Sequence, residues 1–358
     1  MDKDILYIKR CLELAEKGKG YVSPNPLVGA VLVKNNKIIG EGFHKKYGEA
    51  HAEVEAIKNA IVNVKGATLY CNLEPCCHQK KQTPPCVPLI INAKIKKVVI
   101  SNRDPNPLVN GKGIKLLTNA GIEVVTGICK NEGEELNKFY FKYAFTGVPY
   151  ITLKVAQSID GKISGIKKQV WMTGKEAGKY VHRMRANYDA ILVGANTIKV
   201  DNPKLNVRNV KGRNPIRIIL DGSLSINLNS NVLNTDDNYK TWIVTSKKAD
   251  KKKVNELLEH GIKIIQLLSN SNMQIELKKI LKHIGKQKIS SLLVEGGRNI
   301  LSQFTSKNLF DEITVLYSPI LLGKGIDGIS SERRMHLKIV ETERLGKDLR
   351  ITYRKLEE

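Results

Sequence analysis

His51, Cys76 and Cys86 are the residues of this chain whose types and spacing point most directly to chemistry. One imidazole and two thiolates form a three-ligand zinc set with the fourth position open, which is typical of catalytic rather than structural zinc. Water in that position has its pKa lowered toward neutrality by the metal. Glu53 follows His51 by two residues, so its carboxylate is well placed to carry a proton between that water and a leaving group.

The order of these residues narrows the chemistry further. A His-x-Glu pair followed by Pro75-Cys76 and by a second cysteine is the signature of zinc-dependent deaminases of nucleobases and related rings. Taken singly, each cysteine could be a buried small hydrophobe, and His51 and Glu53 could be ordinary surface residues of a helix. The complete set, in this order, favours the metal site.

The position of the second cysteine leaves one alternative open. Nine residues, 77–85, separate Cys76 from Cys86, whereas a short Cys-x-x-Cys spacing is commoner for zinc. Cys77 is therefore a rival ligand, but adjacent cysteines rarely bind one metal, so we predict Cys76 and Cys86. If Cys77 or His78 supplied a fourth ligand, the zinc would be structural and the protein a non-catalytic scaffold.

Length and composition predict a two-domain protein of a reducing compartment. A chain of 358 residues is long enough to form two cores. No apolar run reaches the roughly 20 residues that span a bilayer, and the first residues lack the pattern of a signal peptide. The six cysteines all precede residue 130 and do not suggest a secreted disulfide scaffold. We therefore expect a cytoplasmic protein.

The formal net charge of +24 is compatible with nucleic-acid binding. The lysines are scattered along the whole chain, however, and an aromatic content of 6% offers few base-stacking platforms. We attribute the charge to compositional drift together with a preference for phosphorylated substrates. We expect neither nucleic acid nor a membrane as a partner.

The first part of the chain alternates between helical and strand patterns, which implies helices packed about a mixed sheet. His51 and Cys86 are expected in the first turns of two helices, and Cys76 at the end of a strand. The expected helices are 4–17, 51–61, 84–93, 112–119 and 132–144, and the expected strands are 28–33, 38–43, 67–73, 97–101 and 122–125.

The run Thr146-Gly147-Val148-Pro149 is the predicted boundary, which gives domains 1–147 and 148–358. A second α/β pattern follows, in which residues 173–176 have the sequence of a capping box that opens a helix through Arg185. The other expected helices are 251–259, 275–284 and one after Gly297, and the expected strands are 150–156, 190–193, 216–220, 242–245, 262–265, 291–294, 313–317, 337–341 and 349–353.

Two glycine motifs in the second part are candidate nucleotide sites. Glu295-Gly296-Gly297 ends a predicted strand before a helix, where free amides and the helix dipole favour an anion. Such a turn is also common without a ligand. Residues 323–328 match the dinucleotide pattern G-x-G-x-x-G, but no helix pattern follows them, so we interpret this match as false and the segment as a loop.

The ordered series of motifs resembles the bifunctional deaminase/reductase family of riboflavin biosynthesis, and the resemblance covers nearly the whole chain. In the first part it rests on residues 24–29, 42–44, 48–53, 74–76, 83–86 and 104–107. In the second part it rests on residues 149–154, 158–162, 171–173, 201–203, 215–217 and 294–297.

This resemblance implies an α/β protein with a cytidine-deaminase-like α/β/α domain followed by a dihydrofolate-reductase-like α/β domain. The first would hydrolyse the 2-amino group of 2,5-diamino-6-ribosylamino-4(3H)-pyrimidinone 5′-phosphate. The second would reduce the ribosyl chain to give 5-amino-6-ribitylaminouracil 5′-phosphate. Zinc and NADPH are the implied cofactors, and a homo-oligomer formed through the reductase domain is the implied assembly. The rival interpretation is a nucleic-acid base deaminase with an appended nucleotide-binding domain.

The resemblance also implies roles for individual residues. His51, Cys76 and Cys86 would bind zinc, and the catalytic residues would be Glu53, Lys154, Asp201 and Glu295. Contacts to NADPH would come from Ala156, Trp171, Thr197, Asp201, Gly222, Gly296 and Gly297. Contacts to substrate would come from Asn25, His44, His78, Lys81, Gln169, Arg185, Leu205, Arg208 and Glu295. Arg185 taken alone would be interpreted as a solvated helix residue.

Two departures from the family pattern affect these roles. The loop between Cys76 and Cys86 is one residue longer than usual, so either Lys80 or Lys81 could meet the substrate phosphate. Gln169 stands where the family tends to have Ser. A glutamine side chain can still donate a hydrogen bond.

Overall fold

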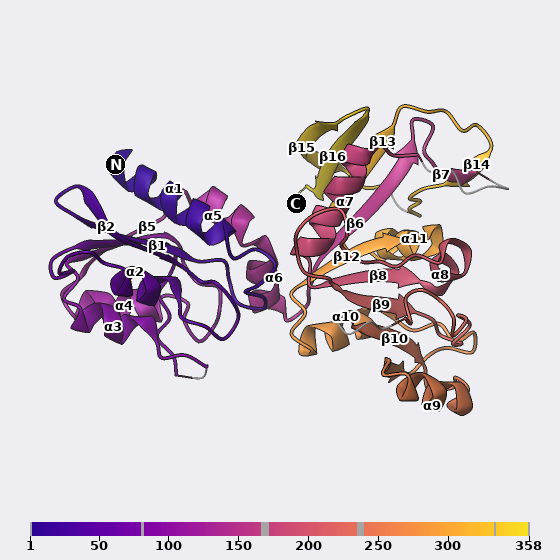
Figure 1. The fold of residues 1–358 in the computed structure, drawn as a ribbon, viewed down its shortest axis with the longest axis horizontal. Coiled ribbons are helices and arrows are strands. Elements are labelled where there is room, and N and C mark those ends of the chain that lie inside the picture. The colour runs from indigo at the N-terminus through magenta and orange to yellow at the C-terminus, as the bar shows by residue number, and fades with distance from the viewer. Residues whose placement is uncertain (1, 80–81, 166–171, 235–239, 333, 357–358) are drawn as a thin grey trace. The chain divides into compact units, whose positions relative to one another are not determined.

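The computed structural model describes residues 2–79, 82–165, 172–234, 240–332 and 334–356. The chain divides into two units, Met1–Gly147 and Val148–Glu358, each with its own sheet (Figure 1). The division lies within the run 146–149 that marks the expected boundary. Among the described residues, no helix has both the length and the apolar character needed to cross a membrane.

The first unit is built on a five-stranded mixed sheet with the strand order β2-β1-β3-β4-β5. Strand β1 pairs antiparallel with β2 and β3, whereas β3, β4 and β5 run parallel. The elements are α1 (Asp2–Glu16), β1 (Gly29–Lys34), β2 (Lys37–Phe43), α2 (Ala52–Lys58), β3 (Thr68–Leu73), α3 (Cys86–Asn92), β4 (Lys97–Asn102), α4 (Lys112–Asn119), β5 (Glu123–Thr126), α5 (Lys130–Leu136) and α6 (Lys138–Thr146).

Alternation along the strands sends apolar side chains to both faces of this sheet. Val31, Tyr70 and Val99 pack against Ile8 and other apolar side chains of α1. Their neighbours in sequence, including Leu32, Leu69 and Ile100, pack on the opposite face with residues of α2, α3 and α4. Figure 1 shows α1 and α5 on one side of the sheet and α2, α3 and α4 on the other. The expected sandwich of helices about a mixed sheet is confirmed.

The expected helix 132–144 is wrong, because two helices, α5 and α6, meet at Asn137. Asn137 has φ −103° and ψ 18°, outside the helical range. Its buried amide accepts the Leu27 N–H at 2.8 Å and donates to the Leu27 carbonyl at 2.9 Å. These two hydrogen bonds to a distant segment hold Asn137 in a non-helical conformation and so separate α5 from α6.

The second unit is built on a nine-stranded sheet with the order β11-β10-β9-β8-β12-β6-β13-β16-β15. The strands from β11 to β13 are parallel, so their carboxyl ends share one edge, and β16 and β15 are antiparallel. The elements are β6 (Tyr150–Ser158), β7 (Lys162–Gly165), α7 (Lys175–Asn187), β8 (Ala190–Gly194), α8 (Ala195–Asp201), β9 (Ile216–Leu220), β10 (Thr241–Ser246), α9 (Lys251–Glu259), β11 (Lys263–Leu267), α10 (Leu277–Lys286), β12 (Ser291–Gly296), α11 (Arg298–Ser306), β13 (Glu312–Ser318), β14 (Gly325–Asp327), β15 (Leu337–Leu345) and β16 (Asp348–Lys355).

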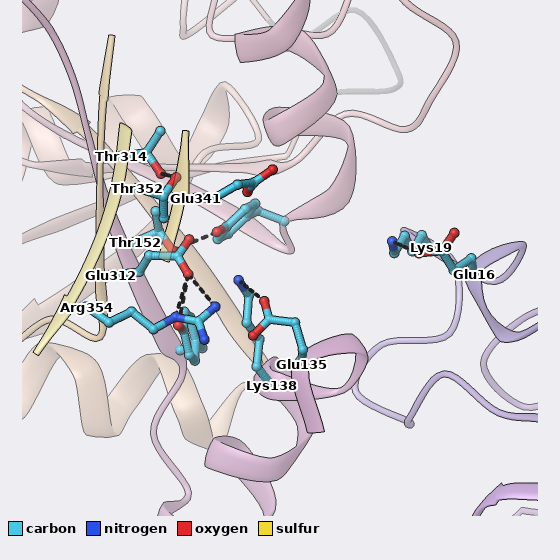
Figure 2. A network of polar contacts seen from close by, with 12 residues as sticks. Glu16, Lys19, Glu135, Lys138, Thr152, Glu312, Thr314, Glu341, Thr352 and Arg354 are labelled. Carbon is cyan, nitrogen blue, oxygen red and sulfur yellow. Dashed lines mark hydrogen bonds and ion pairs between the residues drawn. The ribbon is translucent and has the colours of Figure 1, made fainter. Parts of the chain in front are cut away.

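Helices cover both faces of this sheet with two apolar clusters. Leu281 of α10 and Phe304 of α11 pack with Leu153, Leu192 and Val294 on one face. Side chains of α8 and α9 pack on the other face of β8, β9 and β10. A polar contact also joins two neighbouring strands. Glu312 of β13 accepts hydrogen bonds from Arg354 of β16 at 2.9 and 3.1 Å, as Figure 2 shows.

The capping box expected at residues 173–176 is wrong. Gly174 is the N-cap of α7 and makes no side-chain cap hydrogen bond. Its backbone N–H instead donates to the Asp348 carboxylate at 2.6 Å, across a distance of 174 residues in sequence. The start of α7 is thus held by a long-range carboxylate and not by the local Thr173–Glu176 exchange that a capping box would make.

The interpretation of residues 323–328 as a false dinucleotide match is confirmed, although the segment is not all loop. Residues 325–327 form the short strand β14, which pairs antiparallel with β7. The next element in the chain is β15, a strand and not a helix. The glycine pattern therefore lacks the helix N-terminus that would bind a pyrophosphate.

Candidate active sites

The three predicted zinc ligands each lie at the end of a regular element of the first unit. His51 is the N-cap of α2, one residue before the helix rather than within the expected helix 51–61. Cys76 follows the end of β3, and Cys86 is the first residue of α3 after Pro85. The loop after β3 brings Cys86 back to Cys76. The backbone N–H groups of Cys86 and Val87 donate to the Cys76 carbonyl at 3.0 and 3.2 Å, which holds the start of α3 against the end of this strand.

The geometry of these side chains suits a zinc ion. The Nδ1 atom of His51 lies 3.4 Å from the Sγ atoms of both Cys76 and Cys86. With Zn–S near 2.3 Å and Zn–N near 2.0 Å, a tetrahedral N–S edge is about 3.6 Å. The three ligand atoms all lie within 4.8 Å of one another. The backbone N–H of Cys86 also points at the Cys76 sulfur, at 3.4 Å. The residues present therefore fit a zinc ion.

Cys77, the rival ligand, does not belong to this cluster. Its sulfur lies 3.8 Å from the Leu108 carbonyl. Within the part of the chain that the structure describes, the cluster has three His, Cys or acidic members and no fourth. His78 is half-buried in the following loop. The donor set thus has the composition of a catalytic site with an open position.

Glu53, in the first turn of α2, lies beside the metal cluster. Its side chain is buried, and its Oε2 atom has no hydrogen-bond partner among the described residues. Burial, followed by the neighbouring Cys76 thiolate, raises the pKa of this carboxyl above its ordinary value. A carboxyl group that holds a proton more readily and has a free oxygen is suited to general acid–base catalysis.

His44 lies beside the metal ligand His51 and is hydrogen-bonded to Asn25. The Nδ1 atom of His44 lies 3.0 Å from the Ala50 carbonyl, and its Nε2 atom lies 3.1 Å from the Asn25 amide nitrogen. Because a carbonyl can only accept, Nδ1 carries the proton and Nε2 accepts from Asn25. The imidazole of His44 is 5.3 Å from that of His51, edge to face. The structure thus brings these two expected substrate contacts to the metal site.

In the second unit, three expected residues form a buried ionic cluster at the carboxyl end of the sheet. Glu295, near the end of β12, accepts bidentate bonds from Arg185 of α7 at 2.7 and 2.8 Å. The Lys154 ammonium of neighbouring β6 lies 3.3 Å from Glu295 Oε2, which also accepts from Arg185. The Glu295 side chain is only 5% exposed, and that of Arg185 12%. The interpretation of Arg185 as a solvated helix residue is wrong.

Charge compensation sets the ionisation of this cluster. Burial by itself would raise the pKa of Glu295, but the charges of Arg185 and Lys154 and their hydrogen bonds outweigh it and hold the pKa at about 2. Burial by itself would lower the pKa of Arg185, but the charge of Glu295 and its hydrogen bonds outweigh burial and raise that pKa. Glu295 is therefore an anion at neutral pH, fixed between two cations.

The cluster includes residues that sequence reasoning missed. His182 lies one helical turn before Arg185 on α7, and its Nδ1 atom accepts the backbone N–H of Arg208 at 3.4 Å. Asn206 accepts the Arg185 guanidinium on its backbone carbonyl at 3.2 Å and that of Arg208 on its side chain at 2.9 Å. The i, i+3 spacing of His182 and Arg185 was the available signal, since such residues share a helix face.

A second group of expected residues surrounds the turn after β12. Gly297 has φ +69°, and a Cβ placed on it would lie 2.9 Å from the Thr197 hydroxyl, so glycine is required here. A Cβ placed on Gly296 would lie 3.4 Å from the same hydroxyl, which is ordinary contact. Thr197 lies in the first turn of α8 and Asp201 is its last residue; burial raises the pKa of the Asp201 carboxyl.

The remaining expected residues are more dispersed. Ala156 lies on β6, two residues beyond Lys154, and Leu205 is buried with φ +52° immediately before Asn206. Gly222 follows β9 and packs against the Met273 carbonyl, where a Cβ would lie 2.1 Å away. Lys81, Gln169 and Trp171 fall outside the described residues.

Comparison with known families assigns each unit to a family model. Residues 1–102 match the cytidine and deoxycytidylate deaminase zinc-binding region, and residues 149–351 match the RibD C-terminal domain. The chain is thus an α/β protein with a cytidine-deaminase-type zinc domain followed by a dihydrofolate-reductase-like reductase domain, as expected.

Whole-length relatives define the family. The chain is 44% identical to the riboflavin biosynthesis protein RibD of Aquifex aeolicus over 98% of both proteins. It is 42% identical to RibD of Bacillus amyloliquefaciens, over 97% of this chain and 95% of that protein. The chain belongs to the RibD family of bifunctional deaminase/reductases of riboflavin biosynthesis.

Solved structures of similar chains contain the same two folds. A crystal structure of a diaminohydroxyphosphoribosylaminopyrimidine deaminase/5-amino-6-(5-phosphoribosylamino)uracil reductase from Thermotoga maritima is 37% identical, with a TM-score of 0.87 over 99% of both chains. RibD of Acinetobacter baumannii is 35% identical, with a TM-score of 0.89 over 99% of both chains. The expected family, bifunctional enzyme class and zinc-binding region are confirmed.

Proposed function

We propose that this chain carries out two consecutive steps on one phosphorylated pyrimidine. The first unit removes the 2-amino group of 2,5-diamino-6-ribosylamino-4(3H)-pyrimidinone 5′-phosphate by hydrolysis. The second reduces the ribosyl chain of the product to give 5-amino-6-ribitylaminouracil 5′-phosphate, with NADPH as the hydride donor. The observation that carries the proposal is the presence, in one chain, of an open His51/Cys76/Cys86 cluster with Glu53 and of a separate cluster about Glu295.

In the deaminase unit, zinc at His51, Cys76 and Cys86 would supply a Lewis acid that makes water nucleophilic near neutral pH. Glu53 takes up a proton at Oε2 as water adds to C2 of the ring, and delivers it to the amino group that departs as ammonia. Its raised pKa makes both transfers feasible in one cycle. Asn25 and His44 orient the ring, and Lys81 or its neighbour Lys80 meets the phosphate.

In the reductase unit, NADPH would supply the hydride, and the turn of Gly296 and Gly297 with Thr197 would hold its phosphates or ribose. Lys154 and Glu295 face the reacting sugar, and Arg185 and Arg208 bind the substrate phosphate with their remaining donors. Support comes from the concentration of positive charge around Glu295, where Arg185, Lys154 and Arg208 converge. The proposed fit to NADPH rests on the glycine turn at which a Cβ would collide with Thr197.

The decisive experiment is an assay of the purified zinc-loaded protein with the diaminopyrimidinone phosphate. Without NADPH, we expect ammonia release and accumulation of the deaminated ribosyl compound. Addition of NADPH should then consume one equivalent of NADPH per equivalent of ribityl product. If the protein instead released ammonia from single-stranded nucleic acid and ignored the pyrimidine phosphate, the rival interpretation as a nucleic-acid base deaminase would replace this one.

We also infer that the chain forms a homo-oligomer through the reductase unit in the cytoplasm. Strand β15 is the last strand of the nine-stranded sheet, and its Ile339 and Val340 are 59% and 38% exposed. An exposed edge strand with apolar side chains is a surface that proteins normally cover. Light scattering should report more than one chain per particle, and Val340→Lys should shift the mass toward that of one chain. A single-chain mass for the unmodified protein would overturn this assembly.

A further inference from the structure

The imidazole of His51 has a second polar partner besides the two cysteines. Its Nδ1 atom faces the sulfurs of Cys76 and Cys86, each at 3.4 Å. Its Nε2 atom, on the far side of the ring, lies 3.2 Å from the hydroxyl oxygen of Thr83. Both ring nitrogens are therefore engaged, one by the metal cluster and one by a neutral hydroxyl.

The local sequence explains why Thr83 reaches this position. Thr83 precedes Pro84 and Pro85, and Cys86 comes next. A residue before proline is restricted to extended conformations, and each proline fixes its own φ, so the run Thr83-Pro84-Pro85-Cys86 has little backbone freedom. Pro85 is extended, with φ −66° and ψ 146°, and Cys86 opens α3. This stiff run carries a thiolate to one nitrogen of His51 and a hydroxyl to the other.

We propose that Thr83 is a positioning residue of the zinc centre. With the metal on Nδ1, the neutral imidazole keeps its proton on Nε2, and that N–H donates to the Thr83 oxygen. Such outer hydrogen bonds fix the tautomer and the orientation of a metal-binding histidine, and their loss typically weakens metal affinity 10–100-fold. Thr83 acts on the metal through His51 and needs no contact with substrate for this role.

The test compares zinc affinities of paired variants by competition with a chromophoric chelator. Thr83→Val keeps the shape of the side chain and removes the hydroxyl, whereas Thr83→Ser keeps the hydroxyl and removes the methyl group. We expect zinc binding about 10–100-fold weaker in Thr83→Val and near the original value in Thr83→Ser. Thr118→Val is the matched control, because Thr118 in the same unit donates only to the Ile114 carbonyl of α4, at 3.0 Å.

A second measurement detects the Nε2 proton of His51 directly. In nitrogen-15 NMR spectra of the zinc-loaded protein, the Nε2–H of His51 should be visible and slow to exchange, and in Thr83→Val it should exchange much faster. Unchanged zinc affinity in Thr83→Val would overturn the proposal. Equal weakening in Thr83→Ser would also overturn it, since packing of the methyl group would then be responsible. If Thr83→Val does not fold, Thr83→Ala and Thr83→Ser decide the question, because these two side chains differ by one hydroxyl.

Discussion

Glu295 is a buried anion whose charge is compensated by two neighbouring cations. Its carboxylate is buried between Arg185 and Lys154, and its pKa of about 2 lies below the value near 4.3 of an unfolded glutamate. A depressed carboxyl pKa contributes stability that is present above about pH 4.3 and is lost as the pH falls toward 2. Removing one partner leaves this anion undercompensated inside the protein.

We therefore predict two separable effects from the arginines of this cluster. Arg185→Ala should lower the free energy of unfolding by roughly 3–5 kcal/mol, since it breaks a buried pair, and it should also raise the reductase KM. Arg208→Ala should raise the KM by a factor equivalent to about 1.5–3 kcal/mol with a smaller effect on unfolding. Urea titrations and steady-state kinetics measure the two quantities.

The exposed Arg183, also on α7, provides the control for these variants, and Arg183→Ala should change neither quantity. Deaminase turnover should be unaffected in all three variants, because the cluster belongs to the second unit. Equal loss of both activities would mean that these arginines act on folding or assembly.

His182 should make the second unit sensitive to mildly acidic pH. Burial, followed by the charges of Arg185 and Arg208, lowers the pKa of His182 from 6.5 to about 4. Between these values the unfolded chain binds a proton that the folded chain does not, so the free energy of unfolding should fall as the pH drops from 6.5 to 4. His182→Asn, which keeps an acceptor near the Nδ1 position, should reduce this pH dependence.

The measurement is urea denaturation at pH 7 and pH 5, with His336→Asn at an exposed position as the control. The difference between the two pH values should be smaller in His182→Asn than in the unmodified chain and unchanged in His336→Asn. An identical pH dependence in all three proteins would show that His182 already carries its proton in the folded state.

The choice of thiol at the metal site also remains to be tested directly. Cys86→Ser should lose zinc or bind it far more weakly, because a hydroxyl is a poor substitute for a thiolate. Cys77→Ser should retain about one zinc per chain, since Cys77 lies outside the cluster. Metal content after gel filtration decides between them, and full occupancy in Cys86→Ser would mean that the thiol was misassigned.

At this scale, the sequence was informative where chemistry dictates the residue type. Thiolates, an imidazole and a nearby carboxylate have few other reasons to occur in such an order, so the cluster of His51, Cys76 and Cys86 was predictable. Thr83 and His182 were missed because each contacts another part of the protein and not a ligand. The threonine carries no sequence signal for its contact with His51, and the histidine carries only its i, i+3 spacing to Arg185.

At the scale of elements, segments with a clear apolar pattern were predictable and the junctions between them were not. Helix α4 and strand β9 have the predicted bounds, Lys112–Asn119 and Ile216–Leu220. Strand β7 and helix α8 were absent from the prediction, because neither contains the run of aliphatic side chains that marks the equally short β9. The break at Asn137 and the cap of α7 both depend on partners more than 100 residues away, which local pattern cannot reveal.

Asn137 offers a test of such a long-range junction. Asn137→Ala removes the acceptor of the half-buried Leu27 N–H, while Asn72 still binds the Leu27 carbonyl at 2.9 Å. A fully buried donor left unsatisfied costs about 1–3 kcal/mol, so for this half-buried N–H the free energy of unfolding should fall by roughly 1 kcal/mol. Urea unfolding should show this loss for Asn137→Ala, and Asn119→Ala at an exposed helix end should show almost none. Equal stability of the two variants would contradict the role assigned to the Asn137 amide.

At the scale of the whole molecule, the net charge of +24 does not concentrate in either proposed site alone. The excess of 59 lysines and arginines over 35 acidic residues is spread along the whole sequence. Each unit has its own apolar clusters on both faces of its own sheet. The chain can thus be regarded as two separate cores joined at residues 147–148, and the two chemistries need not share residues.

The last prediction tests this independence. Glu53→Gln keeps the size of the side chain but cannot accept or return a proton, and general acid–base help is worth about 10²–10⁴-fold. Deamination should therefore fall at least that far while zinc stays bound. NADPH oxidation should persist when the deaminated intermediate is supplied, because every proposed reductase residue lies beyond Pro149. Lys154→Ala should do the reverse and cause the deaminated ribosyl compound to accumulate.

Both variants are assayed with each substrate in turn, by ammonia release and by NADPH absorbance. If Glu53→Gln stopped NADPH oxidation even with the intermediate in hand, the two units would be chemically coupled, since no reductase residue was altered. If it left deamination intact, another group would have to carry the proton. The buried position of Glu53 beside Cys76 and its partnerless Oε2 among the described residues both argue that no neighbour can replace it.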